Sequence, residues 1–286
     1  MRLTLLTCAE QPALTADDRL LADALARLGV EVRVSPWSAL DIDAAGAACV
    51  LRSTWDYHVT FAPFIEWLDA IDRRGLRLVN STALVRWNAD KQYLRALEGA
   101  GIALPPTVWL EAPDANAVAD ALAATGWPRA VLKPRVSASA HGTIVVTPSA
   151  TVADDALEPL RAHGALLQAF LPEIEDDGEL SLLYFDGTFS HAVRKRPREG
   201  DFRVQHEFGG SEDAVEPLSI ERVFADRVMA ACPEVPAYAR VDVVTTARGP
   251  VLMELELIEP YLYFAHDDRA AERCARAILA RLRRAP

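Results

Sequence analysis

The sequence has 286 residues, of which 51% are hydrophobic and 25% charged, and its formal net charge is −11. That acidic surplus argues against non-specific nucleic-acid binding, because neutralising phosphates requires surplus Lys and Arg. No stretch approaches the eighteen or so apolar residues of a membrane helix, and the first residues predict a strand instead of a signal peptide. Four widely spaced cysteines argue against a zinc site or a disulfide framework and predict a cytoplasmic protein.

The first eighty residues alternate strand and helix patterns. Strands are expected at LTLLT, VEVRV, AACVLRS and LRLVN. One helix is expected from a cap at Thr15 to about Gly29, and another over residues 63–73. This alternation predicts a parallel sheet covered by helices, and no G-x-G-x-x-G motif follows the first strand.

The remainder mixes strands and helices in a different order. A helix capped by Asn88, with Lys91 in its first turn, precedes a break at the prolines 105–106. Residues 107–167 predict a small unit that contains the strand AVLKP and a loop of small residues. From Glu179 we expect two strands joined by an Asp-Gly turn, a polar loop, a helix near 220–231, two more strands and a helix over 270–283. The fold class predicted is α/β with α+β character.

The segment ARVDVVTTARGPVLMELELIEP is the most informative one. Its Arg-Gly-Pro turn predicts an antiparallel hairpin that places Asp242 opposite Glu254, and alternation puts Glu256 on the same face. Opposed carboxylates repel each other unless the face is wet or a cation lies between them. Three such oxygen ligands suit Mg²⁺, although a solvated sheet face would show the same alternation.

Basic residues elsewhere are candidates for binding phosphate. Lys133 ends a predicted strand beside the loop of small residues, where backbone N–H groups assist anion binding. Lys91 lies where the helix dipole disfavours a cation. A cationic run holds Lys195 and Arg203, and an Arg fork can hold a phosphoryl group bidentately. Each of these residues, taken alone, is also consistent with an exposed surface cation.

Taken in this order along the whole chain, these residues resemble the ATP-grasp superfamily. The resemblance is strongest to the branch of bacterial glutathione synthetase and the ATP-grasp cyclase of cycloserine biosynthesis. It implies a pre-ATP-grasp substrate domain over residues 1–87 and an ATP-grasp domain over 88–286, with a lid subdomain near 107–167. It also implies an enzyme that uses ATP and one or two Mg²⁺ ions, with Mn²⁺ as an alternative metal.

The resemblance further implies roles for individual residues. Lys91, Lys133 and Lys195 would contact phosphates beneath the loop Ser137–Gly142, which includes Ser139. Gln168, Phe170 and Leu171 would form the adenine hinge, Glu179 would hold the ribose, and Asp242, Glu254 and Glu256 would bind metal. Lys133, Lys195 and Arg203 would stabilise the transferring phosphoryl group. Candidates for contacting the substrate are Arg52, Ser53, Trp55, Ser181 and Arg240.

The predicted reaction is phosphorylation of a small-molecule carboxylate to an acyl phosphate, followed by attack of an amine and release of ADP and phosphate. Two alternatives stay open. One is an intramolecular cyclase, in which a single substrate supplies both reacting groups. The other is a nucleotide-binding module without turnover. Neither a nucleic-acid partner nor a membrane partner is expected, and the oligomeric state, a homodimer included, is left open.

Overall fold

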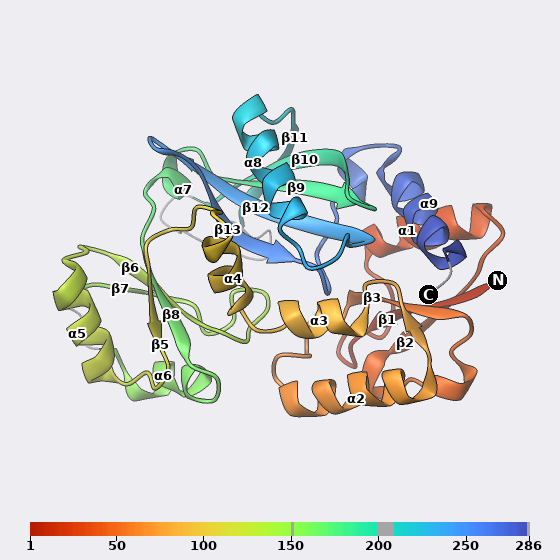
Figure 1. Ribbon diagram of the computed structural model, residues 1–286, viewed down its shortest axis with the longest axis horizontal. Coiled ribbons are helices and arrows are strands. Elements are labelled where there is room, and N and C mark those ends of the chain that lie inside the picture. The colour runs from red at the N-terminus through yellow and green to blue at the C-terminus, as the bar shows by residue number, and fades with distance from the viewer. Residues whose placement is uncertain (150–151, 199–208, 285–286) are drawn as a thin grey trace.

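The computed structural model describes residues 1–149, 152–198 and 209–284, and Figure 1 shows them arranged around three β-sheets. The first sheet lies at the lower right of the view. A central sheet lies above it, and a third sheet, which we call the lid sheet, lies at the left.

The first sheet is parallel throughout, as the alternation of strands and helices predicts. Its order is β2-β1-β3-β4, from β1 (Arg2–Thr7), β2 (Glu31–Pro36), β3 (Ala48–Ser53) and β4 (Arg77–Leu78). Helices α1 (Ala16–Arg27) and α2 (Phe61–Arg74) cover opposite faces, because Leu5 packs in one apolar cluster with α1 and Leu6 in another with α2. The Thr15 side chain accepts from the Asp18 N–H and caps α1, as expected. Two 3₁₀ turns, η1 (Trp37–Ala39) and η2 (Ile42–Ala44), follow β2.

The prediction that a helix begins at Asn88 is wrong. Asn88 is the last residue of α3 (Thr82–Asn88), and the next helix, α4, begins only at Tyr93 and ends at Gly99. The Asn88 side chain does not cap a helix. It donates to the Leu255 carbonyl at 2.8 Å and accepts from the Leu257 N–H at 2.8 Å, which ties α3 to the last strand. Lys91 therefore lies in the turn before α4.

The lid sheet is antiparallel, with the order β5-β8-β6-β7. Its strands are β5 (Thr107–Leu110), β6 (Ala130–Pro134), β7 (Ile144–Val146) and β8 (Ala165–Ala169). Helices α5 (Ala115–Thr125) and α6 (Asp154–Arg161) pack on it around a separate apolar cluster that contains Leu132, Leu157 and Leu167. This self-contained core agrees with the small unit expected over 107–167, while the exact domain boundaries stay predictions.

The central sheet is also antiparallel, with the order β11-β10-β9-β12-β13. Its strands are β9 (Glu179–Phe185), β10 (Thr188–Arg196), β11 (Ser211–Val215), β12 (Tyr238–Thr246) and β13 (Gly249–Glu256). A short helix, α7 (Glu173–Asp176), precedes β9, and α8 (Ser219–Ala230) covers the outer face (Figure 1). The sequence missed β11, because its mostly exposed SEDAV residues show no apolar alternation.

The C-terminal helix α9 (Ala270–Arg283) has the bounds that its periodicity predicts. It follows the 3₁₀ turn η4 (Phe264–His266) and lies beside α1 (Figure 1). One apolar cluster joins Ile278 of α9 to Leu3 of the first sheet and Leu183 of the central sheet. The last helix therefore fastens the first sheet to the central sheet. In the described part of the chain, no helix is both long enough and apolar enough to cross a membrane.

The predicted hairpin register is confirmed. Asp242 of β12 pairs with Glu254 of β13, and Arg240 pairs with Glu256, with an irregularity after Asp242. These four charged side chains consequently line one wall of the cavity described next.

Candidate active site

A cavity of about 530 Å³ lies where the three sheets meet. Its walls come from the loop after β3, from β6 and β8 of the lid sheet, and from β9, β10, β12 and β13 of the central sheet. The structure brings most of the predicted site residues together in this cavity. Those that line it are Trp55, Lys91, Lys133, Ser137, Ser139, Gln168, Leu171, Glu179, Lys195, Arg240, Asp242, Glu254 and Glu256.

The two predicted phosphate lysines occupy different environments. Lys91 is held by its backbone N–H, which donates to the Arg135 carbonyl at 2.9 Å. Its Nζ donates to the Ser137 carbonyl at 2.9 Å and lies 3.1 Å from Glu254. Lys133 has no hydrogen-bond or ion-pair partner among the described residues, and burial lowers the pKa of its ammonium. Lys133 is therefore a cation available to an anionic ligand.

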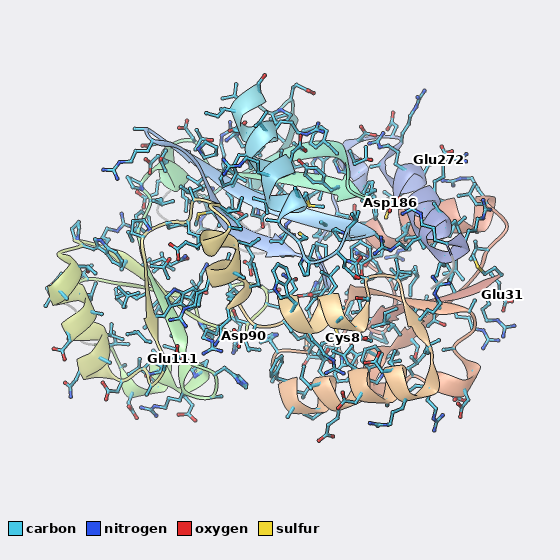
Figure 2. All side chains as sticks on the ribbon, viewed as in Figure 1. Cys8, Glu31, Asp90, Glu111, Asp186 and Glu272 are labelled. Carbon is cyan, nitrogen blue, oxygen red and sulfur yellow. The ribbon has the colours of Figure 1, made fainter. Side chains whose placement is uncertain are left out.

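Arg135 strengthens the junction that carries Lys91. Its guanidinium lies 2.6 Å from Asp90 and 2.8 Å from Glu111, both labelled in Figure 2. Asp90 immediately precedes Lys91, and Glu111 immediately follows the lid strand β5. The lid sheet and the turn that carries Lys91 are thus joined by a partly buried ion pair.

The small-residue loop Ser137–Gly142 covers part of the cavity. Ser139 and Ala140 both have left-handed backbone angles, with φ of 49° and 55°, and the His141 N–H donates to the Ala138 carbonyl. This is a tight turn of the kind that usually contains glycine. Gly142 does not line the cavity. A Cβ there would lie 2.9 Å from Pro134, so it serves the close packing of the loop.

One part of the cavity is apolar. Val131 shares the inward face of β6 with Lys133, because side chains alternate along a strand. Leu171, Ile174 and Met253 add to this surface and pack together in one apolar cluster. The Gln168 side chain donates to the Thr107 hydroxyl at 3.0 Å, and Gln168 and Ala169 both line this part of the cavity.

The Phe170 ring lies outside the cavity lining. The Arg129 guanidinium stacks over it at 3.7 Å from the ring centroid. Phe170 therefore supports the predicted hinge by packing, and any contact of residue 170 with a nucleotide would be through its backbone.

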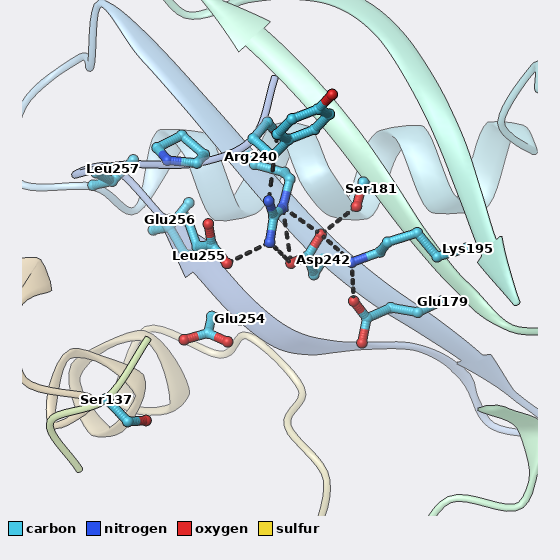
Figure 3. A network of polar contacts seen from close by, with 12 residues as sticks. Ser137, Glu179, Ser181, Lys195, Arg240, Asp242, Glu254, Leu255, Glu256 and Leu257 are labelled. Atoms are coloured by element: carbon cyan, nitrogen blue, oxygen red, sulfur yellow. Dashed lines mark hydrogen bonds and ion pairs between the residues drawn. The ribbon is translucent and has the colours of Figure 1, made fainter. Parts of the chain in front are cut away.

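A network of charges lines the cavity, and Figure 3 shows most of it from close by. Lys195, which is 3% exposed, lies 2.5 Å from Glu179 and 3.4 Å from Asp242. Arg240 pairs with Asp242 at 3.0 Å and also with Glu256. Each acid is thus matched by a cation, which offsets the cost of burying the charges. We call Lys91, Lys133, Glu179, Lys195, Arg240, Asp242, Glu254 and Glu256 the charged centre.

The pKa values in the charged centre follow from this pairing. Burial favours the neutral acid at Asp242, but Arg240 and Lys195 outweigh it and hold the carboxyl pKa below its ordinary value. At Glu256, burial dominates and raises the pKa to about 7 despite Arg240. Ser181 does not line the cavity, and its hydroxyl donates to Asp242 at 2.5 Å. Ser181 thus acts on the carboxylate and makes no contact with the cavity.

The three predicted metal ligands share one wall, yet their oxygens face protein cations. Among residues 1–149, 152–198 and 209–284, no three Asp, Glu, His or Cys side chains cluster closely enough to hold a metal ion. Lys91 bonds Glu254, and Arg240 lies between Asp242 and Glu256. The donor set nevertheless fits Mg²⁺, since it consists of carboxylate oxygens, provided that Lys91 moves off Glu254.

Two predicted substrate residues lie elsewhere. Arg52 is 2% exposed and does not line the cavity. Its guanidinium donates to Asp18 at 2.8 Å and to the Pro260 carbonyl at 2.7 Å, so it is committed to holding the chain. Ser53 is fully buried, and its hydroxyl faces no described partner. Trp55 does line the cavity, and Arg203 lies outside the described residues.

Sequence reasoning gave no role to Tyr57 or Glu259, which line the cavity together with the predicted Trp55 and the two tyrosines that follow the acidic hairpin. We call Trp55, Tyr57, Tyr261 and Tyr263 the aromatic wall; the two tyrosines after β13 lie 5.0 Å apart between ring centroids. Glu259 also lines the cavity and is 9% exposed. Burial, and then the like charges of Glu256 and Glu254, hold the pKa of Glu259 well above its usual range. The Glu-Pro pair at 259–260 was the available signal, but no local pattern gives Glu259 a role.

Comparison with known proteins agrees with this geometry. The structure matches an ATP-grasp ligase, PsnB, solved with Mg and ADP, with a TM-score of 0.65 at 17% identity over 98% of both chains. The structure therefore has the fold of the ATP-grasp ligases. Residues 3–80 match the family model for the N-terminal domain of D-cycloserine synthetase DcsG.

The full chain matches the cycloserine biosynthesis protein DcsG of Streptomyces lavendulae at 30% identity over 98% of this chain and 99% of that one. The crystal structure of D-cycloserine synthetase DcsG superposes with a TM-score of 0.87 at 28% identity, covering 99% and 100% of the two chains. The chain belongs to the DcsG family of ATP-grasp enzymes. It is accordingly an enzyme of the ATP-dependent ligase or cyclase type.

Proposed function

We propose that this enzyme phosphorylates the carboxylate of a small molecule with ATP and couples the resulting acyl phosphate to an amine, releasing ADP and phosphate. One observation carries the proposal: a single cavity combines an apolar surface, three lysines and the acidic hairpin. The first sheet, over residues 1–87, would supply the substrate side. The remainder, over 88–286, would bind the nucleotide, with the lid sheet closing on it.

The apolar surface and the backbone of residues 168–171 are suited to adenine. The lining residues that would contact ATP are Lys91, Lys133, Ser137, Ser139, Gln168, Leu171, Glu179 and Lys195. Gly142 and Phe170 lie outside the lining, so Gly142 would shape the loop and residue 170 would act through its backbone. Lys133 is the strongest candidate for binding phosphate, because it lacks a partner among the described residues. A buried cation without a counter-charge is costly, and a phosphate would compensate it.

Asp242, Glu254 and Glu256 would hold one or two Mg²⁺ ions, with Mn²⁺ as the alternative metal. When bound, such an ion neutralises charge on the nucleotide phosphates and orients them. Lys91, displaced from Glu254, would then reach the phosphates from its turn beneath the loop. Arg240 keeps Asp242 and Glu256 oriented on the wall, as the structure already has them.

The chemistry divides into two steps. A carboxylate oxygen of the substrate attacks the γ-phosphorus of ATP, the bond to the bridging oxygen breaks, and ADP leaves with the electron pair. An amine then attacks the acyl carbon, the C–N bond forms, phosphate leaves, and the amine loses a proton. Lys133 and Lys195, with Arg203, would stabilise the oxygens on which charge develops. The closed loop would exclude water from the acyl phosphate.

An intramolecular cyclase is the second candidate. It is favoured by the similarity to D-cycloserine synthetase over the whole chain, the N-terminal 3–80 included. In a cyclase one molecule supplies both the carboxyl and the nitrogen. The two candidates differ in a single observable, since only a ligase needs a second substrate for sustained release of phosphate.

The test is a phosphate-release assay with Mg·ATP across amino acids, dipeptides and ureido compounds, each alone and in pairs. Added hydroxylamine would capture an acyl phosphate as a hydroxamate. Release that requires one compound plus hydroxylamine, or a paired amine, supports a ligase. Release with one compound alone and a cyclic product supports a cyclase. Nucleotide binding with neither phosphate nor hydroxamate across the panel would refute both and leave a binding module.

A further inference from the structure

Glu259 is the one acid of the cavity lining without a partner among the described residues. The other acids there are Glu179, Glu212, Asp242, Glu254 and Glu256. Each of them faces a Lys, Arg or His side chain within 3.7 Å. Glu259 makes neither a hydrogen bond nor an ion pair with a described residue. An acid buried beside like charges is costly, so its placement calls for a compensating group.

The backbone around Glu259 is held in place from several sides. The Tyr238 hydroxyl donates to the Ile258 carbonyl at 3.1 Å, and Arg52 donates to the Pro260 carbonyl at 2.7 Å. Arg240 donates to the Tyr261 carbonyl at 3.3 Å.

Beyond that point, His191 lies 3.1 Å and 3.2 Å from the next two carbonyls, those of Leu262 and Tyr263. Buried side chains from β3, β10 and β12 therefore fix the segment 258–263. These hydrogen bonds hold the backbone of Glu259 in place beside the cavity, and a binding group fixed in this way is preorganised.

Aromatic rings accompany the carboxylate. Tyr57 is 4% exposed. Burial raises the pKa of its phenol, and the charge of the nearby Glu259 is the second cause. The Tyr57 hydroxyl has no hydrogen-bond partner in the described part of the chain. Trp55 comes from the same loop, and Tyr261 follows Glu259 by two residues. A carboxylate that lines the same cavity as several aromatic side chains is a suitable site for an ammonium group, because both kinds of group attract a cation.

Charge is distributed unequally between two walls of the cavity. Among the described lining residues, the cation without a partner is Lys133 on the lid sheet, and the acid without a partner is Glu259, next to the Pro260 carbonyl held by Arg52 of the first sheet. Anionic groups of ATP and of the acyl donor are drawn to the former and repelled from the latter. A neutral hydroxyl would not stabilise the ionised form of Glu259, whereas an ammonium would.

The geometry points to Glu259 as the residue that selects an amine-bearing acyl donor, by binding its ammonium against the aromatic wall. This inference rests on the proposed function, since it says which residue binds the end of the acyl donor that does not receive the phosphoryl group. Arg52 is then a positioning residue, which acts through the Pro260 carbonyl and does not touch the substrate.

The test compares matched acyl donors, with hydroxylamine as the common acceptor. The donors are the panel amino acid that gives most hydroxamate and its deamino counterpart. The wild-type enzyme should prefer the amino acid by roughly 10²-fold in kcat/KM, the scale of one buried ion pair. Glu259→Gln should lose most of that preference, chiefly through KM for the amino acid, while the deamino compound reacts as before.

Glu212→Gln is the matched control, because Glu212 lines the same cavity but faces His266 at 3.7 Å. It should keep the wild-type preference. Titration with Mg·AMPPNP and thermal unfolding complete the test: Glu259→Gln should bind Mg·AMPPNP as the wild type does, and it should be at least as stable. A weakened Mg·AMPPNP complex would overturn the inference by making Glu259 part of the metal site.

An equal loss with both donors would also overturn it, while hydroxamate formation by the wild type would leave the proposed function standing. If the wild-type enzyme yields no hydroxamate with any panel member, the proposed function fails, and the inference fails with it. The two failures are therefore distinguishable.

Discussion

In the charged centre, Lys195 has two carboxylate partners within 3.4 Å, whereas at the aromatic wall Glu259 has none among the described residues. The centre is built so that cations and acids balance each other before any ligand arrives. On the aromatic side, Glu259 has no such partner among the described residues. A balanced network tolerates burial and can exchange partners when phosphate or metal enters. An unbalanced charge binds one kind of group and rejects others.

The comparison separates general from specific chemistry. In the proposed function, nucleotide and metal would meet residues most of which already hold one another in place. Selection among acyl donors would then depend on Glu259, which lacks a partner among the described residues. The following predictions test this division, starting with the largest effect.

Glu254→Gln should reduce phosphate release by roughly 10²–10³-fold, the scale for losing one charge that stabilises the transferring group. Lys91 keeps its bonds to Ser137, so the protein should stay folded. Turnover and thermal unfolding are measured together. Glu272→Gln, on the exposed side of α9 (Figure 2), is the control and should match the wild type. Wild-type turnover in Glu254→Gln would exclude the hairpin from the reaction.

Lys195→Met and Lys133→Met should change stability in opposite directions. Removing Lys195 leaves Glu179 and Asp242 without that cation and should cost about 3–5 kcal/mol of the free energy of unfolding. Removing Lys133 eliminates a buried, unpaired ammonium and should raise stability by about 1 kcal/mol. Denaturant titrations measure both variants. Equal destabilisation would show that both lysines are paired with carboxylates to the same extent.

The same two variants should also separate in nucleotide binding. Lys133→Met should weaken Mg·AMPPNP binding by about tenfold or more, since a charge-assisted bond to phosphate is lost. Calorimetric titration measures this at a temperature where both variants are folded. Unchanged affinity in Lys133→Met would remove Lys133 from the phosphate site.

The contribution of two buried histidines to stability should fall as the pH falls from about 6.5 towards 4, because both are held neutral in the folded protein. Burial lowers the pKa of His58 and of His191 to about 4. The unfolded chain keeps the ordinary value near 6.5, so it binds more protons across this window and is favoured as pH falls. His191→Gln, which retains a donor for the Leu262 carbonyl, should flatten the pH dependence of unfolding by about one proton. An unchanged slope would contradict a neutral buried His191.

Ala140→Gly should stabilise the closed loop by a few tenths to about 1 kcal/mol. Ala140 has φ of 55°, a region that glycine enters without strain. Thermal unfolding measures the change. Ala162→Gly, at the right-handed C-cap of α6, is the control and should be neutral or destabilising. Destabilisation by Ala140→Gly would show that the loop gains more from the alanine methyl group than it loses in strain.

Local sequence patterns determined much of this molecule. Period-two alternation and the Arg-Gly-Pro turn set the register of Asp242 against Glu254, because strand pairing next to a tight turn leaves few alternatives. Apolar spacing set the bounds of α9 and the parallel order of the first sheet. Residue type and order also indicated most of the cavity lining, from Lys91 to Glu256.

Tertiary packing decided which partner each charge has. Asn88 reads as a helix cap, yet it holds the last strand 167 residues further along the chain. Arg52 reads as a ligand at a strand end, yet it holds the Pro260 carbonyl 208 residues away. No local sequence pattern gives Glu259 a role. Its proposed role in binding an ammonium comes from its burial without a partner among the described residues. Such pairings join distant segments, and the strength of a buried charge depends on which groups packing brings within a few ångströms of it.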